Sequence, residues 1–118
     1  MTATAEFTEY VLELLGSIHD ISTKRFFGGV GISHDTVQFA MIMGNSLYFV
    51  VDDITREKYT KVQKEPFSYL TKKGRVLVKK YYEVPEHLFD DQDELTKWAN
   101  ESIVVAKKTK KSRKRNNP

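Results

Sequence analysis

Apolar residues recur at helical spacing near the start of the chain and then form two dense apolar runs. The spacing predicts a first helix over residues 5–18. The runs at 36–43 and 46–51 predict two strands. Gly44 and Asn45 lie between them and suit a two-residue hairpin turn, so these strands are expected to pair.

A short helix and a second hairpin are predicted in the middle of the chain. Residues 54–62 follow Asp52 and Asp53, and either carboxylate is suited to cap a helix there. Residues 67–70 and 75–84 have strand patterns and flank a Lys-Lys-Gly turn. The second of these strands is expected to stop at the next proline, which cannot donate to a strand ladder.

The last helix is predicted from a capping box formed by Asp91 and Glu94. Five residues beyond it have the spacing of an inward-facing stripe: Leu95, Trp98, Ala99, Ser102 and Ala106. The helix is expected to fray at Lys107, where a run of basic residues begins. Residues 1–106 are therefore predicted to form one domain, and residues 107–118 a disordered basic tail.

A glycine-rich segment at residues 25–32 separates the first helix from the strands. Gly28, Gly29 and Gly31 resemble the first half of a phosphate-binding loop. Such a loop needs a helix after it, whereas a strand pattern follows here and no Lys-Ser or Lys-Thr is present. The segment is therefore predicted to be a strand whose glycines admit a kink or the close approach of another backbone or ring.

The predicted order is α-β-β-β-α-β-β-α, which indicates an α+β fold with a two-layer architecture. Short links between strands favour a five-stranded antiparallel sheet with helices on one side. The strands at 36–43 and 46–51 do not alternate apolar and polar residues, as a sheet with one solvated face would. We therefore expect a homodimer that covers the second face, the alternative being a last helix that wraps around it.

Composition excludes several classes of function. The chain has no cysteine, which removes disulfides, thiolate metal sites and a cysteine nucleophile. Its N-terminus lacks the pattern of a signal peptide, and no apolar run is long enough to span a membrane. A cytoplasmic location without membrane contact is the resulting expectation.

The net charge of +3 conceals two oppositely charged parts. Residues 1–106 carry 12 Lys or Arg against 16 Asp or Glu, a net charge of −4. Seven cations follow and are candidates for nucleic-acid contact: Lys107, Lys108, Lys110, Lys111, Arg113, Lys114 and Arg115. Such contacts would be salt-sensitive and would carry little sequence information. A solvated tail is the alternative.

No set of residues predicts catalysis, a cofactor or a metal. His19, His34 and His87 lack ligand spacing. The acidic residues at 52–53 and 90–94 are explained by helix capping and the helix dipole. We therefore expect that the protein is not an enzyme.

An ordered set of motifs nevertheless resembles a known family. Phe-Gly-Gly-x-Gly after the first helix is followed by Phe-Ala-Met, Leu-Tyr-Phe-Val, Pro-Phe-x-Tyr and Tyr-Tyr-Glu-Val-Pro, with Trp98 in the last helix. Together these are similar to the N-terminal domain of the TfoX/Sxy competence regulators, over residues 5–106. The residues that carry the signature are Phe27, Gly28, Gly29, Gly31, Tyr81, Tyr82 and Pro85.

The resemblance implies a small α+β fold similar to secretion chaperones, and a role in transcriptional regulation of bacterial competence alongside a cyclic-AMP-receptor-type activator. Longer members carry a second, helical domain where this chain has its basic run. The resemblance brings no catalytic residues with it.

Three functions remain open from the sequence. The first is a non-enzymatic regulatory module that binds a protein partner, such as a transcription factor, while the basic tail adds non-specific DNA contact. The second is a chaperone-like protein-binding domain with no nucleic-acid role. The third is a small ligand-binding protein or enzyme.

Overall fold

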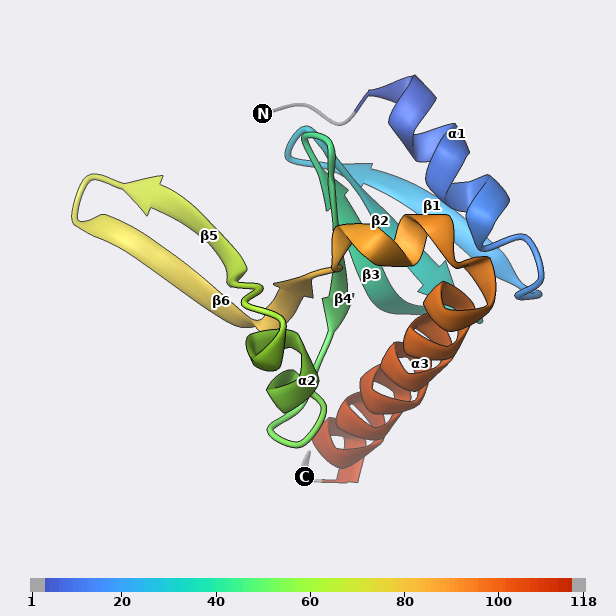
Figure 1. The fold of residues 1–118 in the computed structure, drawn as a ribbon. Helices are drawn as coiled ribbons and strands as arrows, with labels where there is room; N and C mark the ends of the chain where they lie inside the picture. Colours follow the sequence, from blue (N-terminus) through green and yellow to red (C-terminus); the bar gives the residue numbers. More distant parts are fainter. Residues whose placement is uncertain (1–3, 116–118) are drawn as a thin grey trace.

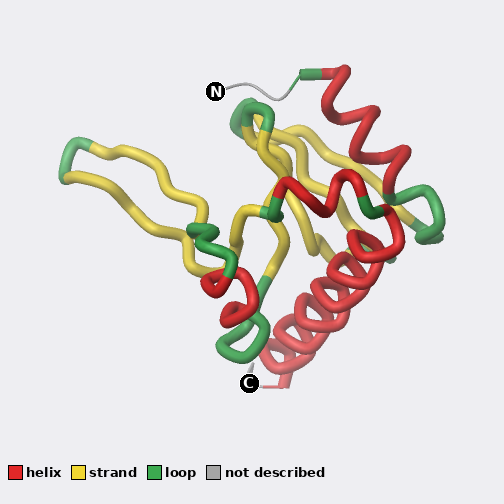
Figure 2. The backbone as a smooth tube through the Cα atoms, viewed as in Figure 1, coloured by secondary structure: helices red, strands yellow, loops and turns green. Residues whose placement is uncertain are grey.

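The computed structural model describes residues 4–115, with side chains up to Lys110. In chain order the elements are α1 (Ala5–Leu14), β1 (Ile21–Phe26), β2 (Gly29–His34), β3 (Val37–Met43), β4 (Ser46–Val50), α2 (Arg56–Lys61), β5 (Pro66–Thr71), β6 (Gly74–Glu83), the 3-10 helix η1 (Glu86–Asp90) and α3 (Gln92–Arg115). All six strands form one antiparallel sheet in the order β1-β2-β3-β4-β6-β5. Figure 2 shows this sheet with helices gathered beside it, which confirms the α+β class.

The sheet has six strands, so the prediction of five was wrong. The additional strand is β1, which pairs with β2 from Ile21 opposite His34 to Phe26 opposite Gly29. Its four central residues are polar and exposed because β1 is an edge strand, and they show no apolar alternation. The sequence therefore gave no strand signal at this position.

One face of the sheet carries the hydrophobic core. Six residues of β2, β3 and β4 on this face are at most 4% exposed: Val30, Ile32, Ala40, Ile42, Leu47 and Phe49. They join one cluster with residues of α1, η1 and α3, such as Val11, Leu88 and Leu95. Figure 1 shows α1 and α3 on the same side of the strands, so these helices cover that face.

The β5–β6 hairpin projects away from the helices and from the rest of the sheet (Figure 1). Only the last residues of β6 pair with β4, while the preceding part of β6 pairs with β5 alone. A register shift between Pro66 and Phe67 lies where the hairpin leaves the sheet, and a bulge of this kind bends and twists a strand. Leu70 and Leu77 on the hairpin are 71% and 52% exposed.

The last helix differs from its prediction at one end. The backbone amide of Glu94 donates to the Asp91 carboxylate at 3.2 Å, as the capping box requires for its first half. At the other end α3 does not stop at Lys107 but continues to Arg115. Lys and Arg are good helix formers, and cations near a helix C-terminus are favoured by the helix dipole. Residues 116–118 of the predicted tail lie outside the described residues.

Candidate interaction surfaces

The glycine segment folds into a tight turn and a strand. Phe27 and Gly28 both have positive φ, +44° and +80°, and connect β1 to β2. Gly29 begins β2, and a Cβ atom there would lie 2.7 Å from the carbonyl oxygen of Ile42 and would overlap the sulfur of Met43. The close approach expected for these glycines is therefore present, and Gly29 permits β2 to pack against β3.

Gly31 makes room for a polar pair. A Cβ atom on Gly31 would overlap the side-chain amide of Gln38. That amide donates from Nε2 to the hydroxyl of Tyr81 at 3.0 Å. Burial raises the pKa of Tyr81, and the hydrogen bond with Gln38 opposes the rise. Tyr81 thus keeps its phenolic proton at neutral pH and accepts from Gln38, which leaves its own O–H able to donate.

Tyr82 and Pro85 have structural positions. Tyr82 is 7% exposed, and its ring centroid lies 6.1 Å from that of Tyr59. Tyr59 in turn contacts Trp98 edge to face at 4.8 Å, so Tyr82 belongs to the aromatic core. Burial raises the pKa of Tyr59, with a contribution from Glu101. Pro85 is buried and immediately precedes η1, where the strand ends as predicted.

The side of the sheet that the helices leave open carries an apolar groove. It is lined by Phe26, Phe27, Met43, Phe67 and Tyr69, and its volume is about 500 Å³. Phe27 at the β1–β2 turn is 93% exposed, and Tyr69 on β5 is 48% exposed.

Sequence reasoning missed this apolar groove. Its walls come from the β1–β2 turn and from β5, about forty residues apart, and they meet only because the hairpin bends. The one signal of the groove in the sequence was the presence of aromatic residues in both segments, Phe26 and Phe27 in one and Phe67 and Tyr69 in the other.

Both walls of the apolar groove come from basic segments. No acidic residue lies between Asp20 and Asp35, a stretch that includes exposed Lys24 and Arg25. None lies between Glu65 and Glu83 either, although that stretch carries five Lys or Arg. The groove is therefore lined by apolar residues, and the segments that supply them carry cations and no acid.

A second, polar cleft lies between β6 and the C-terminal part of α3. Its volume is about 380 Å³, and it is lined by Thr36, Val37, Gln38, Lys80, Tyr81, Ala106, Thr109 and Lys110. Of the two lysines, Lys80 is on strand β6 and Lys110 is on helix α3. No carboxylate is among the lining residues. This arrangement is suited to hold an anion.

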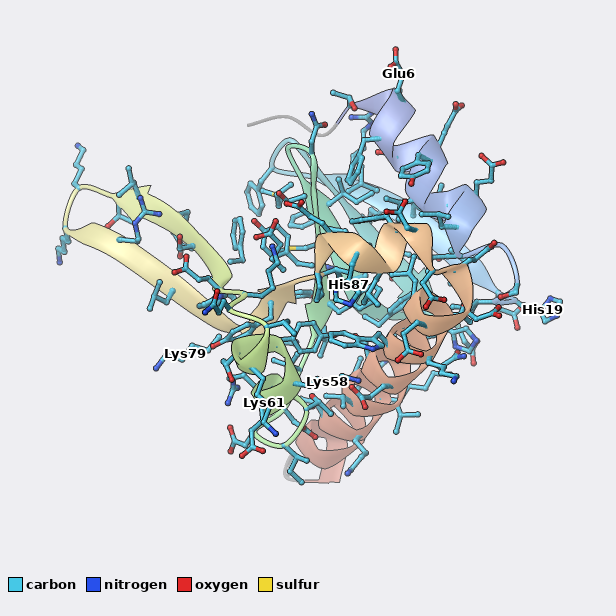
Figure 3. All side chains as sticks on the ribbon, viewed as in Figure 1. Glu6, His19, Lys58, Lys61, Lys79 and His87 are labelled. Atoms are coloured by element: carbon cyan, nitrogen blue, oxygen red, sulfur yellow. The ribbon has the colours of Figure 1, made fainter. Side chains whose placement is uncertain are left out.

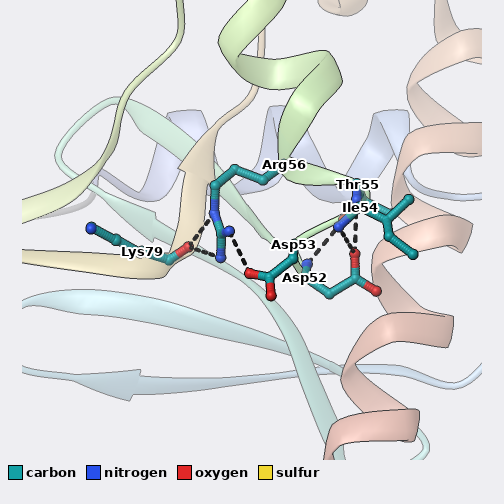
Figure 4. Close-up of polar contacts among 6 residues, drawn as sticks. All are labelled: Asp52, Asp53, Ile54, Thr55, Arg56 and Lys79. Atoms are coloured by element: carbon teal, nitrogen blue, oxygen red, sulfur yellow. Dashed lines mark hydrogen bonds and ion pairs between the residues drawn. The ribbon is translucent and has the colours of Figure 1, made fainter.

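The prediction that Asp52 or Asp53 caps α2 was wrong, because the N-cap residue is Thr55 and it makes no side-chain cap hydrogen bond. The two acids instead make contacts in and beside the turn before α2 (Figure 4). Asp52 Oδ1 accepts hydrogen bonds from the backbone amides of Ile54 and Thr55, at 3.0 and 2.8 Å. The amide of Thr55 is the largest influence that lowers the pKa of Asp52, and Lys108 lowers it further. Asp53 pairs with Arg56 at 2.8 Å, and the Arg56 guanidinium also donates to the carbonyl of Lys79.

The three histidines are not brought together. His19 lies in the loop between α1 and β1 and His87 lies in η1, the two are well separated in Figure 3, and both are exposed. No group of three or more His, Asp or Glu within the described residues is arranged to hold a metal ion. No helix in the described part of the chain combines the length and apolarity needed to cross a membrane.

The structure places only part of the basic run. Lys107 is half-buried, while Lys108 and Lys110 are exposed and Lys110 lines the polar cleft. Lys111, Arg113, Lys114 and Arg115 lie in α3, but their side chains are outside the described residues.

Comparison with known protein families supports the resemblance to the TfoX N-terminal domain that the glycine and tyrosine motifs indicated. Individually curated proteins yield no match. The model of one family, described as the TfoX N-terminal domain, matches residues 13–106. The match spans the sheet, η1 and most of α3, including the turn at Phe27 and Gly28, the Gly31–Tyr81 neighbourhood and Pro85. The chain belongs to the TfoX N-terminal domain family.

Proposed function

We propose that this domain is a non-enzymatic regulatory module that binds a protein partner through the apolar groove. Membership of the TfoX N-terminal domain family supports a regulatory, competence-related role. The observation that carries the proposal is Phe27, a large apolar side chain that is 93% exposed at the edge of the groove. Exposed aromatic residues around an apolar pocket are typical of protein interfaces.

Charge defines the chemistry of this partner. Strand β1, which contributes Phe26 to the groove, carries Lys24 and Arg25 and no acid. Complementary charge favours a partner segment that has apolar anchors flanked by Asp or Glu. Such a segment would place its anchors between Phe27 and Tyr69.

A photo-crosslinking experiment tests the groove. A benzophenone side chain at position 27 is expected to capture the partner in cells, and nuclease treatment should not remove the product. Reversing Lys24 and Arg25 to Glu should reduce the capture, whereas a benzophenone at exposed Ile54 should not give the same product. Equal products from positions 27 and 54, or no effect of the charge reversal, would contradict binding at the groove.

We further propose that the basic end of α3 adds non-specific affinity for nucleic acid. Its cations follow Glu101 without an intervening acid, so their charge is not neutralised within the helix. Substituting every Lys and Arg after Ala106 by Gln keeps good helix formers and removes the charge. Binding to a labelled DNA duplex at low salt should be lost while the thermal unfolding midpoint stays unchanged.

Homodimerisation stays a prediction. Met41 faces away from the helices yet is only 4% exposed within one chain, so the bent sheet itself covers part of this face. The remaining apolar surface is the groove and the hairpin. A molecular mass of one chain by light scattering at about 100 μM would exclude a dimer in this concentration range.

A chaperone-like domain without a nucleic-acid role is the second candidate. The net charge of −4 over residues 1–106 favours it, because most of the folded body would repel nucleic acid. Persistent DNA binding by the wild-type chain at 150 mM salt would count against this candidate.

A further inference from the structure

We propose that the polar cleft between β6 and α3 binds a phosphate group of a nucleic-acid backbone. This inference rests on the nucleic-acid contact proposed above and assigns to it a defined site within the fold. Lys80 on β6 and Lys110 on α3 are both among the residues that line the cleft. Tyr81 also lines the cleft, and its neutral phenolic hydroxyl is a hydrogen-bond donor.

The hydroxyl of Tyr81 is prepared for this contact. Its oxygen already accepts from Gln38 Nε2 at 3.0 Å, so the remaining proton can be directed towards a ligand. Thr109 donates its hydroxyl to the carbonyl of Val105 at 3.0 Å, so the Thr109 proton is already used within α3. The lining thus offers two lysine side chains and an O–H donor, the kinds of donors that bind phosphate oxygens.

The surroundings of the cleft favour a polynucleotide over a free phosphate ion. On one side β6 leads into the hairpin, whose Lys72, Lys73, Arg75 and Lys79 are exposed. On the other side α3 continues with the remaining cations of the basic run. The cleft thus joins two acid-free basic segments, and a chain of phosphates can follow both of them. Asp35 directly precedes Thr36, one of the lining residues, but Asp35 itself does not line the cleft.

The closing experiment uses the full-length chain and a fluorescein-labelled 20-base-pair DNA duplex, with anisotropy measured at several salt concentrations. The double variant Lys80→Gln with Lys110→Gln is expected to weaken binding about tenfold at low salt. The dependence of log K on log salt should fall by about 0.9, the value for one phosphate contact. Tyr81→Phe removes only the O–H and should weaken binding several-fold. Thermal unfolding checks that each variant is folded.

A charge-matched control separates the cleft from net charge. Lys61→Gln with Lys97→Gln also removes two positive charges, from exposed positions on α2 and on the first half of α3. This pair should change duplex affinity less than twofold. Equal losses in both double variants would overturn the proposal, because overall charge would then account for binding.

Further outcomes separate this inference from the broader proposal. If Gln substitutions after Lys110 abolish duplex binding while the cleft variants bind normally, the basic run acts and the cleft does not. If neither set of substitutions affects duplex binding, both proposals fail. Calorimetry with inorganic phosphate tests the other possible ligand. If phosphate binding depends on Lys80 and Lys110 while substitution of these two residues leaves duplex binding unchanged, the assignment to a nucleic-acid backbone is overturned.

Discussion

The Oγ atom of Ser102 lies 2.7 Å from the carbonyl oxygen of Phe39. It also lies 2.9 Å from the carbonyl oxygen of Val50, so two strands share one hydroxyl proton from α3. The pairing of β3 with β4 ends at Ala40 and Phe49, and Ser102 joins the strands just beyond that point. Ser102 is 1% exposed and is the one buried polar residue among the described residues.

Ser102→Ala should therefore destabilise the domain by about 1–3 kcal/mol, since it leaves buried carbonyl groups without this donor. Urea unfolding followed by circular dichroism measures the change. Thr96→Val is the matched control, because the Thr96 hydroxyl donates within α3 to Gln92 and joins no strand. If Ser102→Ala lowers the unfolding free energy no more than Thr96→Val does, the bridging role of Ser102 is contradicted.

Gly29 and Gly31 should respond differently to an added methyl group. The Cβ of Gly29→Ala would meet the backbone carbonyl of Ile42 as well as Met43, and a backbone atom cannot move aside cheaply. We expect a loss of about 1–3 kcal/mol, as for other overpacked sites. The three atoms nearest to the Cβ of Gly31→Ala all belong to the side chain of Gln38.

The strain in Gly31→Ala should therefore be relieved by a second substitution, Gln38→Ala. Unfolding free energies of both single variants and the double variant form a double-mutant cycle. The double variant Gly31→Ala with Gln38→Ala should lose less unfolding free energy than the sum of the two single variants. Gly29→Ala with Gln38→Ala should be additive. Additivity in both cycles would show that Gln38 does not limit the space at Gly31.

The elements that could be predicted from the sequence are those with a local signal. The capping box at Asp91 and the turn at Gly44 and Asn45 mark their elements through nearby residues. The last two strands and α2 were likewise placed to within a few residues. The edge strand β1 was missed because its polar residues face solvent on both sides of the strand.

The candidate surfaces depend on long-range geometry and were only partly predictable. The basic run was visible as composition, but its position next to Lys80 follows from the packing of α3 on the sheet. Phe67 and Tyr69 gave no sign that they would face Phe26, because the bend of the β5–β6 hairpin brings them together. Tyr81 and Tyr82 were grouped by sequence, yet adjacent strand residues point to opposite faces.

Lys58 should stabilise the packing of α2 on α3 through Trp98, the single tryptophan of the chain. Its Nζ atom lies 4.2 Å from the centroid of the Trp98 ring and 2.7 Å from Glu101 Oε1. Lys58→Gln removes both interactions and should cost about 1 kcal/mol.

Glu101→Gln separates these two contributions, because it removes the ion pair and keeps the cation above the ring. Its effect should be smaller and should disappear in 1 M salt. Trp98 fluorescence follows unfolding and reports the local change directly. If Glu101→Gln costs as much as Lys58→Gln, the contact with the ring contributes nothing measurable.

Asp52 should make the stability of the domain depend on pH at the acidic end. Hydrogen bonds from Thr55 and Ile54 lower its folded-state pKa below the usual Asp value. Its contribution is therefore fully present above about pH 4, the unfolded-state range, and is lost as pH falls through the lower folded-state pKa. Asp52→Ala should cost about 1 kcal/mol at pH 7, as for other lost side-chain to backbone hydrogen bonds.

Asp52→Asn tests the charge separately, because an amide oxygen still accepts the two hydrogen bonds. The stability difference between wild type and Asp52→Asn should be largest near pH 6 and should shrink towards pH 3, measured by urea unfolding. Asp53→Asn is the control: its carboxylate is 97% exposed and pairs only with Arg56, so a small effect is expected. A difference for Asp52→Asn that stays constant from pH 6 to pH 3 would show that the Asp52 charge does not stabilise the turn before α2.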